Sequence, residues 1–327
     1  MELVSGHNNI LKKAFPSPVV TIGNFDGVHL GHNQIIKNMI AKAKLQGGTS
    51  IVYTFRPHPF YVLRPERHLP LLTTYDQRNK LLGELGVDIL IEEPFSREFS
   101  NLTAERFFYE ILLHKINVKE IVVGYDFSFG KEREGHLENL RSFCKKTKVS
   151  LDIVSPLIVN EDVVSSTQIR NYLIKGEIER ANRLLGRGFF YEGNVIKGVG
   201  RGHQIGFPTA NLRPESVSCQ LLLSNGVYAT KTRVIPRAGS SVRPSVKLSV
   251  INDMFQSITN IGVRPTFRSN EEALPPILVE TYLLDMDIDL YGAEIQVCFV
   301  KKLRDEKRFS GLEELKKQIE KDIQAAR

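Results

Sequence analysis

Between residues 18 and 156, short apolar runs alternate with segments of helical spacing, and this alternation restricts the fold more than any other feature. The apolar, mostly β-branched runs lie at 18–23, 50–55, 87–91, 120–124 and 151–156. The helical segments, in which apolar residues recur every three or four positions, lie at 32–48, 73–86 and 103–115. Strands alternating with helices of this length predict an α/β domain, a parallel sheet covered on both faces. Such sheets bind ligands beyond the carboxyl ends of their strands.

After residue 186 the pattern changes. One or two short helices are expected over 165–186, and strand-like runs separated by Gly, Pro and Asn then follow at 189–198, 226–234, 277–285 and 294–303. This pattern predicts a small antiparallel β-barrel. Apolar residues on one face of 311–326 predict a closing helix. A length of 327 residues suits two domains, and we expect the boundary near Gly186, with domains 1–186 and 187–327.

Composition excludes several classes of protein. No apolar run approaches the roughly 20 residues that span a bilayer, and residues 1–20 lack a basic start followed by an apolar core, so we expect a cytoplasmic protein. The cysteines Cys144, Cys219 and Cys298 are far apart, which argues against a disulfide framework and a structural zinc site. The net charge of +7 suits nucleotides or phosphorylated metabolites as well as nucleic acid. The basic residues are scattered, so we expect neither a nucleic-acid nor a membrane partner.

The segment GNFDGVHLGH, residues 23–32, stands between the first predicted strand and the first predicted helix. Its glycines allow a tight turn, and Gly31 lets backbone approach a ligand closely. The start of the helix offers free N–H groups and a positive dipole end, to which His29 and His32 would add donors for phosphate oxygens. No GxxxxGK[ST] phosphate loop exists in the chain. The alternative is a glycine-rich turn with two surface histidines, but the place between strand and helix favours function.

Two more segments suggest ligand binding in the first domain. In VSSTQIR, residues 164–170, hydroxyl groups at a helix start precede Arg170 by one turn and could hold a phosphate; the alternative is simple N-capping. In VVGYDFSFGKEREG, residues 122–135, Asp126 and two aromatic residues lie between glycines after a strand. These residues could shape a nucleotide or flavin pocket, or form a turn with core phenylalanines.

The barrel region carries a neutral oxygen pair and an acidic residue. Thr209 and Asn211, in GVGRGHQIGFPTAN, are separated by one residue, so a strand would point both to the same face. Neutral oxygens together with nucleotide phosphates suit Mg²⁺, which keeps few protein ligands. Glu280 stands between apolar strand residues and is either salt-bridged or a general base.

The segment 23–32 resembles that of the HxGH nucleotidyltransferases, and the whole chain resembles a more specific family. The matching segments, in order, are GNFDGVHLGH, LLTTYDQR, VGYDFSFG, SSTQIR, GRGHQIGFPTAN, NGVYA, NIGVRPTF, DLYG and FVKKLRDEKRF. They closely resemble the bacterial bifunctional riboflavin kinase/FAD synthetases. The resemblance implies a Rossmann-like N-terminal domain that transfers AMP from ATP to FMN, giving FAD and pyrophosphate. It implies that the C-terminal domain phosphorylates the ribityl 5′-hydroxyl of riboflavin with ATP.

The resemblance also implies roles for individual residues. Binding of ATP or of its phosphates is implied for Gly23, Asn24, Phe25, Asp26, Gly27, His29, Gly31, His32, Asp126, Ser165, Ser166, Thr167, Arg170, Gly200, Gly206, Thr209 and Asn211, with Asp126 near nucleotide and metal. Within this set His29 and His32 are catalytic, and Thr209 and Asn211 bind Mg²⁺. Glu280 is implied as the catalytic base of the kinase, and Phe127 and Arg304 as flavin neighbours.

Three departures from the family bear on the first reaction and on the barrel. Arg56 stands where the family usually carries an acidic residue, Ser128 stands where arginine is common, and the segment 234–257 is longer than usual. One alternative is therefore a riboflavin kinase whose first domain has lost adenylylation. Another is a nucleotide-sensing or RNA-binding protein built from the same folds. The joint retention of the histidines, the oxygen pair and Glu280 weighs against a sensor.

Overall fold

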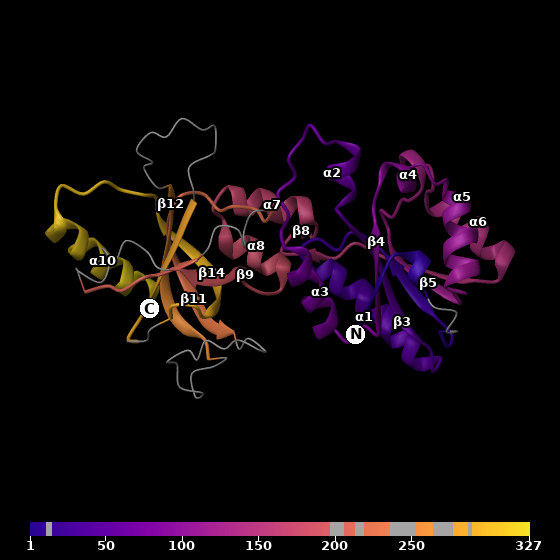
Figure 1. The fold of residues 1–327 in the computed structure, drawn as a ribbon, viewed down its shortest axis with the longest axis horizontal. Coiled ribbons are helices and arrows are strands. Elements are labelled where there is room, and N and C mark those ends of the chain that lie inside the picture. Colours follow the sequence, from indigo (N-terminus) through magenta and orange to yellow (C-terminus); the bar gives the residue numbers. More distant parts are fainter. Residues whose placement is uncertain (11–14, 197–205, 213–218, 236–252, 264–276, 287–289) are drawn as a thin grey trace. The chain divides into compact units, whose positions relative to one another are not determined.

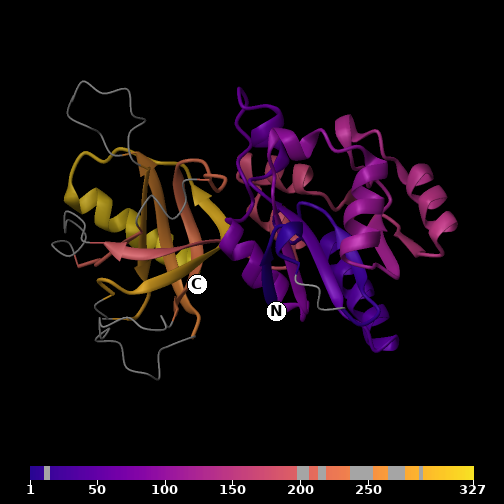
Figure 2. The same ribbon diagram turned by 45° about the vertical axis from the view of Figure 1, so that its right-hand side comes forward.

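The computed structural model describes residues 1–10, 15–196, 206–212, 219–235, 253–263, 277–286 and 290–327 (Figures 1 and 2). The chain forms two compact units, Met1–Ser166 and Thr167–Arg327. Residues 236–252 of the long segment 234–257 lie outside the described residues, as does Gly200. The residues between Thr167 and Gly186 cluster with the barrel, whereas the sequence places the domain boundary near Gly186. The boundary at which each domain can fold by itself stays a prediction.

The first unit is built on a parallel sheet of six strands, which confirms the predicted α/β class. The strands are β1 (Glu2–Ser5), β2 (Val19–Ile22), β3 (Ser50–Arg56), β4 (Ile89–Pro94), β5 (Glu120–Gly124) and β6 (Ser150–Val154). Their order is β1-β4-β3-β2-β5-β6, and every neighbouring pair is parallel. The strand β1 was not predicted; it is an edge strand of four residues in which only Val4 is buried. Such a strand is too short and too polar to show a periodic pattern.

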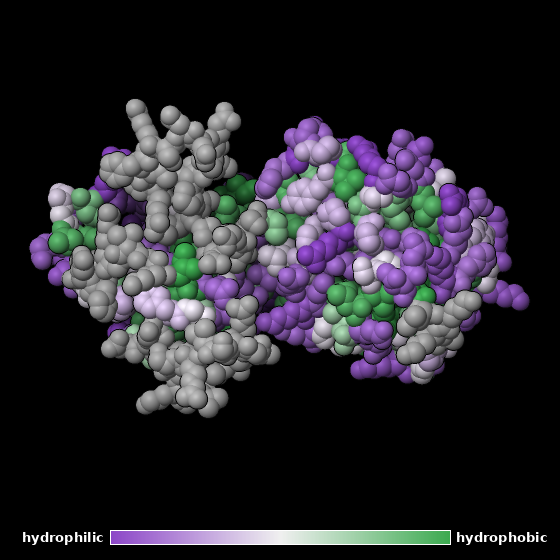
Figure 3. All heavy atoms as spheres, viewed as in Figure 1, coloured by the Kyte–Doolittle hydropathy of each residue, from purple (hydrophilic) through white to green (hydrophobic). Residues whose placement is uncertain are grey.

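Helices cover both faces of this sheet because alternate strand residues point to opposite sides. On one face, Val19 and its neighbours pack against Met39 of α1 (Leu30–Leu45) and residues of α3 (Tyr75–Glu84). On the other, Val20 and its neighbours pack against Phe108 and residues of α6 (Leu137–Thr147). In the view of Figure 3, hydrophilic residues surround smaller hydrophobic groups on the outside of this unit.

The segment predicted as a helix at 103–115 is helical but not regular. It begins as α5 (Ala104–Arg106) and continues as a π-helix, Phe107–Lys115, after which Ile116 N donates to Ile111 O at 3.0 Å. The spacing of its buried residues 107, 108, 111 and 112 suits an α-helix as well as a π-helix, so the sequence pattern cannot distinguish the two helix types. The remaining short elements of this unit are α2 (Pro59–Leu63), α4 (Arg97–Ser100), the 3₁₀-helices His7–Asn9 and Lys131–Arg133, and the hairpin β7 (Ile158–Val159) and β8 (Asp162–Val163).

The second unit contains a closed antiparallel barrel, as the sequence predicts. Its strands are β9 (Phe189–Ile196), β10 (Ala210–Leu212), β11 (Gly226–Ile235), β12 (Phe255–Val263), β13 (Ile277–Leu283) and β14 (Glu294–Arg304). They close in the order β10-β13-β12-β11-β14-β9. The helices α7 (Ser166–Ile174), α8 (Ile178–Leu185) and the predicted closing helix α10 (Leu312–Ala326) complete the unit.

The interior of the barrel holds a row of hydroxyl groups. Thr230 bonds to Ser257 and Thr259 at 2.8 Å, and Thr259 bonds to Thr281 at 2.8 Å. All four residues are buried, and they satisfy one another's polar atoms without water. Because side chains alternate along a strand, Glu280 must point to the outer face, where α10 packs.

The helix α8 contributes to the stability of the barrel. Asn182 Nδ2 donates to Phe299 O, and Phe189 N donates to Asn182 Oδ1, both at 2.8 Å. Ala181, Leu184 and Leu185 are almost wholly buried in the same unit. A barrel that starts at Phe189 therefore loses packed apolar surface and two hydrogen bonds.

We expect a fragment 189–327 to fold and form FMN, but to melt well below a fragment 167–327. Burying one Leu side chain contributes roughly 1.5–3 kcal/mol, so losing α8 should lower Tm by roughly 10 °C. Thermal unfolding by circular dichroism and FMN formation measure both properties. Equal melting temperatures would contradict a stabilising role of α8, and an unfolded 189–327 would show that the barrel needs these helices. Asn182→Ala in the longer fragment isolates the hydrogen bonds.

Candidate functional site

The sheet of the first unit reverses its winding between β2 and β5. The strands β2, β3 and β4 proceed in one direction, whereas β5 and β6 lie on the other side of β2. Ligands of parallel sheets bind at such a point, beyond the carboxyl ends of the strands. The loops that leave β2 and β5 there are the two glycine-containing segments singled out in the sequence.

The loop after β2 has a fixed and unusual conformation. Phe25, Gly27 and Val28 have φ angles of 50°, 84° and 38°. A Cβ on Gly27 would lie 2.7 Å from Leu72 Cδ1, so this position requires glycine. The Asp26 carboxylate accepts hydrogen bonds from Leu72 N at 2.9 and 3.1 Å. Asp26 therefore holds the loop against residues 72 and 73, and its predicted phosphate contact stays a prediction.

The two histidines lie together at the start of α1. His29 is the N-cap, and its Nδ1 accepts a hydrogen bond from His32 N at 3.3 Å. The two rings are stacked, with centroids 3.5 Å apart and planes at 17°, and Phe25 packs edge-on against His32 at 5.2 Å. The arrangement suits anion binding at the helix start.

Part of the predicted second phosphate-binding loop, 164–170, lies against the histidine-containing loop after β2. Ser166 Oγ donates to Asp26 O at 3.0 Å, and a Cβ on Gly31 would lie 3.6 Å from Val164 O. The stretch 164–166, which includes Ser165, therefore lies against the histidine loop. Thr167 and Arg170 belong to α7 in the second unit, and their roles stay predictions.

A cleft of about 680 Å³ opens beyond β5 and is lined by Asp126, Phe127, Ser128 and Arg133 among others. Phe127 stacks on Phe129 with centroids 5.3 Å apart, and Ser128 Oγ accepts from Arg133 Nε at 2.6 Å. Gly124, the last residue of β5 before the cleft, packs against α1, because a Cβ there would lie 3.3 Å from Ile35 Cδ1. Its volume lies within the range of about 300–1,000 Å³ typical of small-molecule sites.

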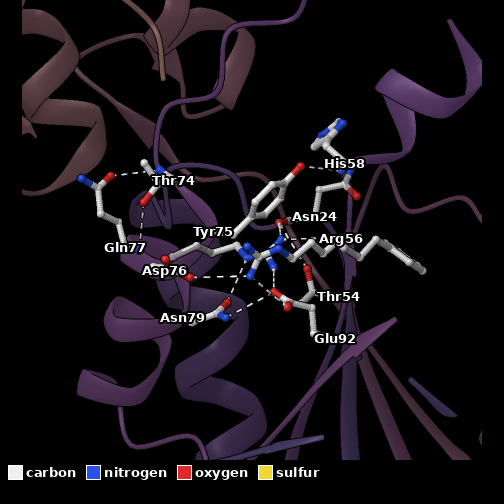
Figure 4. A network of polar contacts seen from close by, with 12 residues as sticks. Asn24, Thr54, Arg56, His58, Thr74, Tyr75, Asp76, Gln77, Asn79 and Glu92 are labelled. Atoms are coloured by element: carbon white, nitrogen blue, oxygen red, sulfur yellow. Dashed lines mark hydrogen bonds and ion pairs between the residues drawn. The ribbon is translucent and has the colours of Figure 1, made fainter. Parts of the chain in front are cut away.

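Charged and polar side chains from α3, β3 and β4 form a network that reaches the loop after β2 (Figure 4). Arg78 Nη2 bonds to Glu92 Oε1 at 2.7 Å, and its Nη1 donates to the carbonyl of Asn24 at 3.2 Å. Burial lowers the pKa of Arg78, and Glu92 partly offsets this effect. Arg78 lies in the segment LLTTYDQR, but no role was predicted for it from the sequence. The available signal was an arginine on the helix face that also carries Leu81 and Leu82.

Arg56 joins the same network from the rim. Its Nη1 lies 3.6 Å from Asp76 Oδ1 and 3.6 Å from Glu92 Oε2, and its guanidinium stacks on Tyr75 at 4.9 Å. The side chain is 48% exposed, so these contacts are weak ones. They supply carboxylate partners for Arg56 within the protein.

We expect Arg56→Glu to lower the stability of the first unit, because it places a third carboxylate beside Asp76 and Glu92. The loss should be about 1 kcal/mol, or roughly 2–4 °C in Tm, and smaller for Arg56→Gln. The sequence-based expectation that an acidic residue here raises FAD formation or lowers its Mg²⁺ requirement stays a prediction. Melting curves and an Mg²⁺ titration of FAD formation measure both effects. Unchanged Tm and unchanged rates would show a solvated rim residue.

In the second unit, Asn211 and Glu280 are directly opposite each other on β10 and β13. Asn211 is 4% exposed, and its Oδ1 has no hydrogen-bond partner within the described part of the chain. Thr209 lies just before β10 rather than in it, and Phe207 packs edge-on against Tyr282 at 5.5 Å. A buried amide oxygen without a partner fits a hard cation such as Mg²⁺. Gly206 is exposed at the start of this segment.

Arg304 has a structural partner. Its Nε lies 3.0 Å from both carboxylate oxygens of Asp322, and its Nη2 lies 2.8 Å from Oδ2. This bidentate pair attaches the end of β14 to α10, and Asp322 is buried. The implied contact of Arg304 with flavin stays a prediction.

Among the residues that the structure describes, His, Cys, Asp and Glu form no group of three or more that could hold a metal ion. The candidate Mg²⁺ ligands are a threonine and an asparagine, which lie outside that class. Over the same described ranges, no helix is long and apolar enough to cross a membrane.

Comparison with known families identifies the two units. The family described as FAD synthetase matches residues 11–168, and the family described as riboflavin kinase matches residues 185–327. The fold and sites thus define a nucleotidyltransferase joined to a flavin kinase.

Full-length relatives combine the same two units. Proteins named bifunctional riboflavin kinase/FMN adenylyltransferase are 36% identical in Buchnera aphidicola, over 99% of this chain and 97% of the relative, and 33% identical in Bacillus subtilis, over 98% and 94%. The chain belongs to the bifunctional riboflavin kinase/FMN adenylyltransferase family. A crystal structure from Streptococcus pneumoniae, described as a macrolide-efflux protein, has a TM-score of 0.84 and 26% identity, covering 100% of this chain and 99% of that chain.

Proposed function

We propose that this protein makes FAD from riboflavin in two ATP-dependent steps, one in each unit. The observation that carries this proposal is that each unit has the groups its own reaction needs. The first has two stacked imidazoles at a helix start, 3.5 Å apart. The second has a carboxylate, Glu280, directly opposite a buried amide, Asn211. A riboflavin kinase with a degenerate first domain is the less favoured function, because the FAD synthetase family matches that domain.

In the adenylyltransferase step, an oxygen of the FMN phosphate attacks the α-phosphorus of ATP. A new P–O bond forms, the bond between the α-phosphorus and the bridging oxygen breaks, and pyrophosphate leaves. The attacking phosphate is already anionic, so the reaction needs no strong base. His29, His32 and the start of α1 would stabilise charge on the triphosphate, and the adjoining cleft with Asp126 and Phe127 would take the flavin.

In the kinase step, the 5′-hydroxyl of riboflavin attacks the γ-phosphorus of ATP, and ADP leaves. Glu280 would accept the hydroxyl proton as the new P–O bond forms. Thr209 and Asn211 would hold Mg²⁺, which when bound neutralises charge on the phosphates. Within the described ranges Asn211 Oδ1 has no hydrogen-bond partner, which supports this assignment.

One assay separates the possible functions. The protein is incubated with riboflavin, Mg²⁺ and ATP, and FMN and FAD are separated by chromatography. Formation of both products supports the proposal, and FMN alone would identify a kinase with an inactive first domain. Absence of both would favour a sensor or an RNA-binding protein, whose RNA binding should weaken steeply with salt. Supplying FMN instead of riboflavin tests the second step independently.

A further inference from the structure

Two successive rungs of the barrel face outward beside the candidate kinase site. The directly opposed residues of β12 and β13 are Ile258–Tyr282 and Asn260–Glu280. The first rung is apolar and packs against Ile323 of α10. The second rung is polar and continues onto β10, because Asn211 lies opposite Glu280 on its other side. Glu280 therefore has an amide side chain on each neighbouring strand.

Residues directly opposed on neighbouring strands have Cβ atoms about 5 Å apart, which brings their side chains within reach of each other. The amide of Asn260 has two N–H donors, and an ionised carboxylate only accepts. Asn260 is therefore placed to donate to Glu280 from the β12 side. Asn211 approaches from the β10 side, where its oxygen suits the cation.

A second carboxylate lies near Asn260 on its other side. A Cβ on Gly262 would collide with Glu306 Oε1 and lie 3.5 Å from Asn260 Nδ2, so the carboxylate and the amide both lie over Gly262. Asn225 Nδ2 holds the other oxygen of Glu306 at 3.3 Å. The absence of a side chain at Gly262 leaves room for both groups, and beside a carboxylate a neutral donor suits this position better than an acid.

We propose that Asn260 is a positioning residue for the kinase reaction. Its amide donates to one oxygen of Glu280 and directs the other toward the ribityl hydroxyl. The O–H bond then breaks toward Glu280 while the oxygen bonds to the γ-phosphorus and the bond to ADP breaks. This inference rests on the proposed role of Glu280 as base, and it assigns a function to a residue that the sequence left without one.

The test compares Asn260→Ala and Asn260→Asp with the unaltered full chain. We expect Asn260→Ala to lower kcat for FMN formation about 10-fold, with KM for riboflavin and ATP changed less than about twofold. Asn260→Asp keeps the shape but removes both N–H donors, so it should lower kcat at least as much as Asn260→Ala.

Gln256→Glu is the matched control, since Gln256 is exposed on the same face of β12, about 13 Å from Asn260. Its kcat and KM should match those of the unaltered chain. In a Glu280→Gln background, Asn260→Ala should cause no further loss, because it acts through Glu280. Full multiplication of the two losses would overturn the positioning role, as would unchanged kcat in both Asn260 variants.

The outcomes also separate this inference from the function on which it rests. If the unaltered chain forms no FMN, the proposed kinase function is wrong. If it forms FMN and Glu280→Gln is equally active, the base assignment is wrong, and the role of Asn260 is wrong with it. If Glu280→Gln is impaired but the Asn260 variants are normal, only the inference about Asn260 is wrong. A lower Tm with unchanged turnover per folded molecule shows a structural residue.

Discussion

Glu280→Gln is expected to lower the rate of FMN formation by about 10²–10⁴-fold while riboflavin and ATP still bind. A primary hydroxyl is a poor nucleophile at neutral pH, and a carboxylate within hydrogen-bond reach gives its proton an acceptor. The neutral residues Thr209 and Asn211 cannot replace this group. Phosphoryl transfer depends largely on positioning and charge neutralisation, so the loss should fall near the lower end of that range. Steady-state kinetics of FMN formation measures it.

The structure supplies the control for this variant. Glu280 lies on the outer face of β13, whereas Thr281 joins the buried hydroxyl row, so the glutamine need not disturb the interior. FAD formation from supplied FMN should be unchanged, because that reaction takes place in the other unit. A large fall in Tm with normal turnover per folded molecule would instead support the salt-bridge role considered from the sequence. Equal loss of both activities would indicate misfolding.

Both fold classes were predictable because they depend on the spacing of apolar residues. The runs that became β3 and β5 are buried throughout most of their length, and a parallel strand covered on both faces needs that continuous apolar pattern. The edge strand β1 has no such pattern and was missed. The π-helix was predicted as an α-helix because the spacing of its buried residues suits both types of helix.

The candidate sites were predictable in residue type but not in partner choice. The sequence places His29 and His32 three residues apart at a helix start, but the stacking of their rings depends on the tight loop before them. Arg304 illustrates the opposite case, because its bond to Asp322 joins two elements through a contact that no local motif encodes. Asn211 and Glu280 likewise face each other only because of the register between β10 and β13. These strands are far apart in the sequence, so no local pattern predicts that register.

His29→Ala is expected to lower FAD formation by about 10²–10³-fold and to leave FMN formation nearly intact. Removing one preorganised donor that stabilises developing charge typically has an effect of this size. The same change removes the N-cap of α1, since His29 Nδ1 accepts from His32 N at 3.3 Å. Loss of a cap lowers the free energy of unfolding by about 1 kcal/mol, which is roughly 2–4 °C in Tm for a unit of this size.

His29→Asn separates the two effects, because asparagine is a good N-cap but carries no imidazole. If the imidazole acts on the triphosphate, His29→Asn should melt like the unaltered chain yet remain as deficient in FAD formation as His29→Ala. If capping alone matters, His29→Asn should recover both stability and activity.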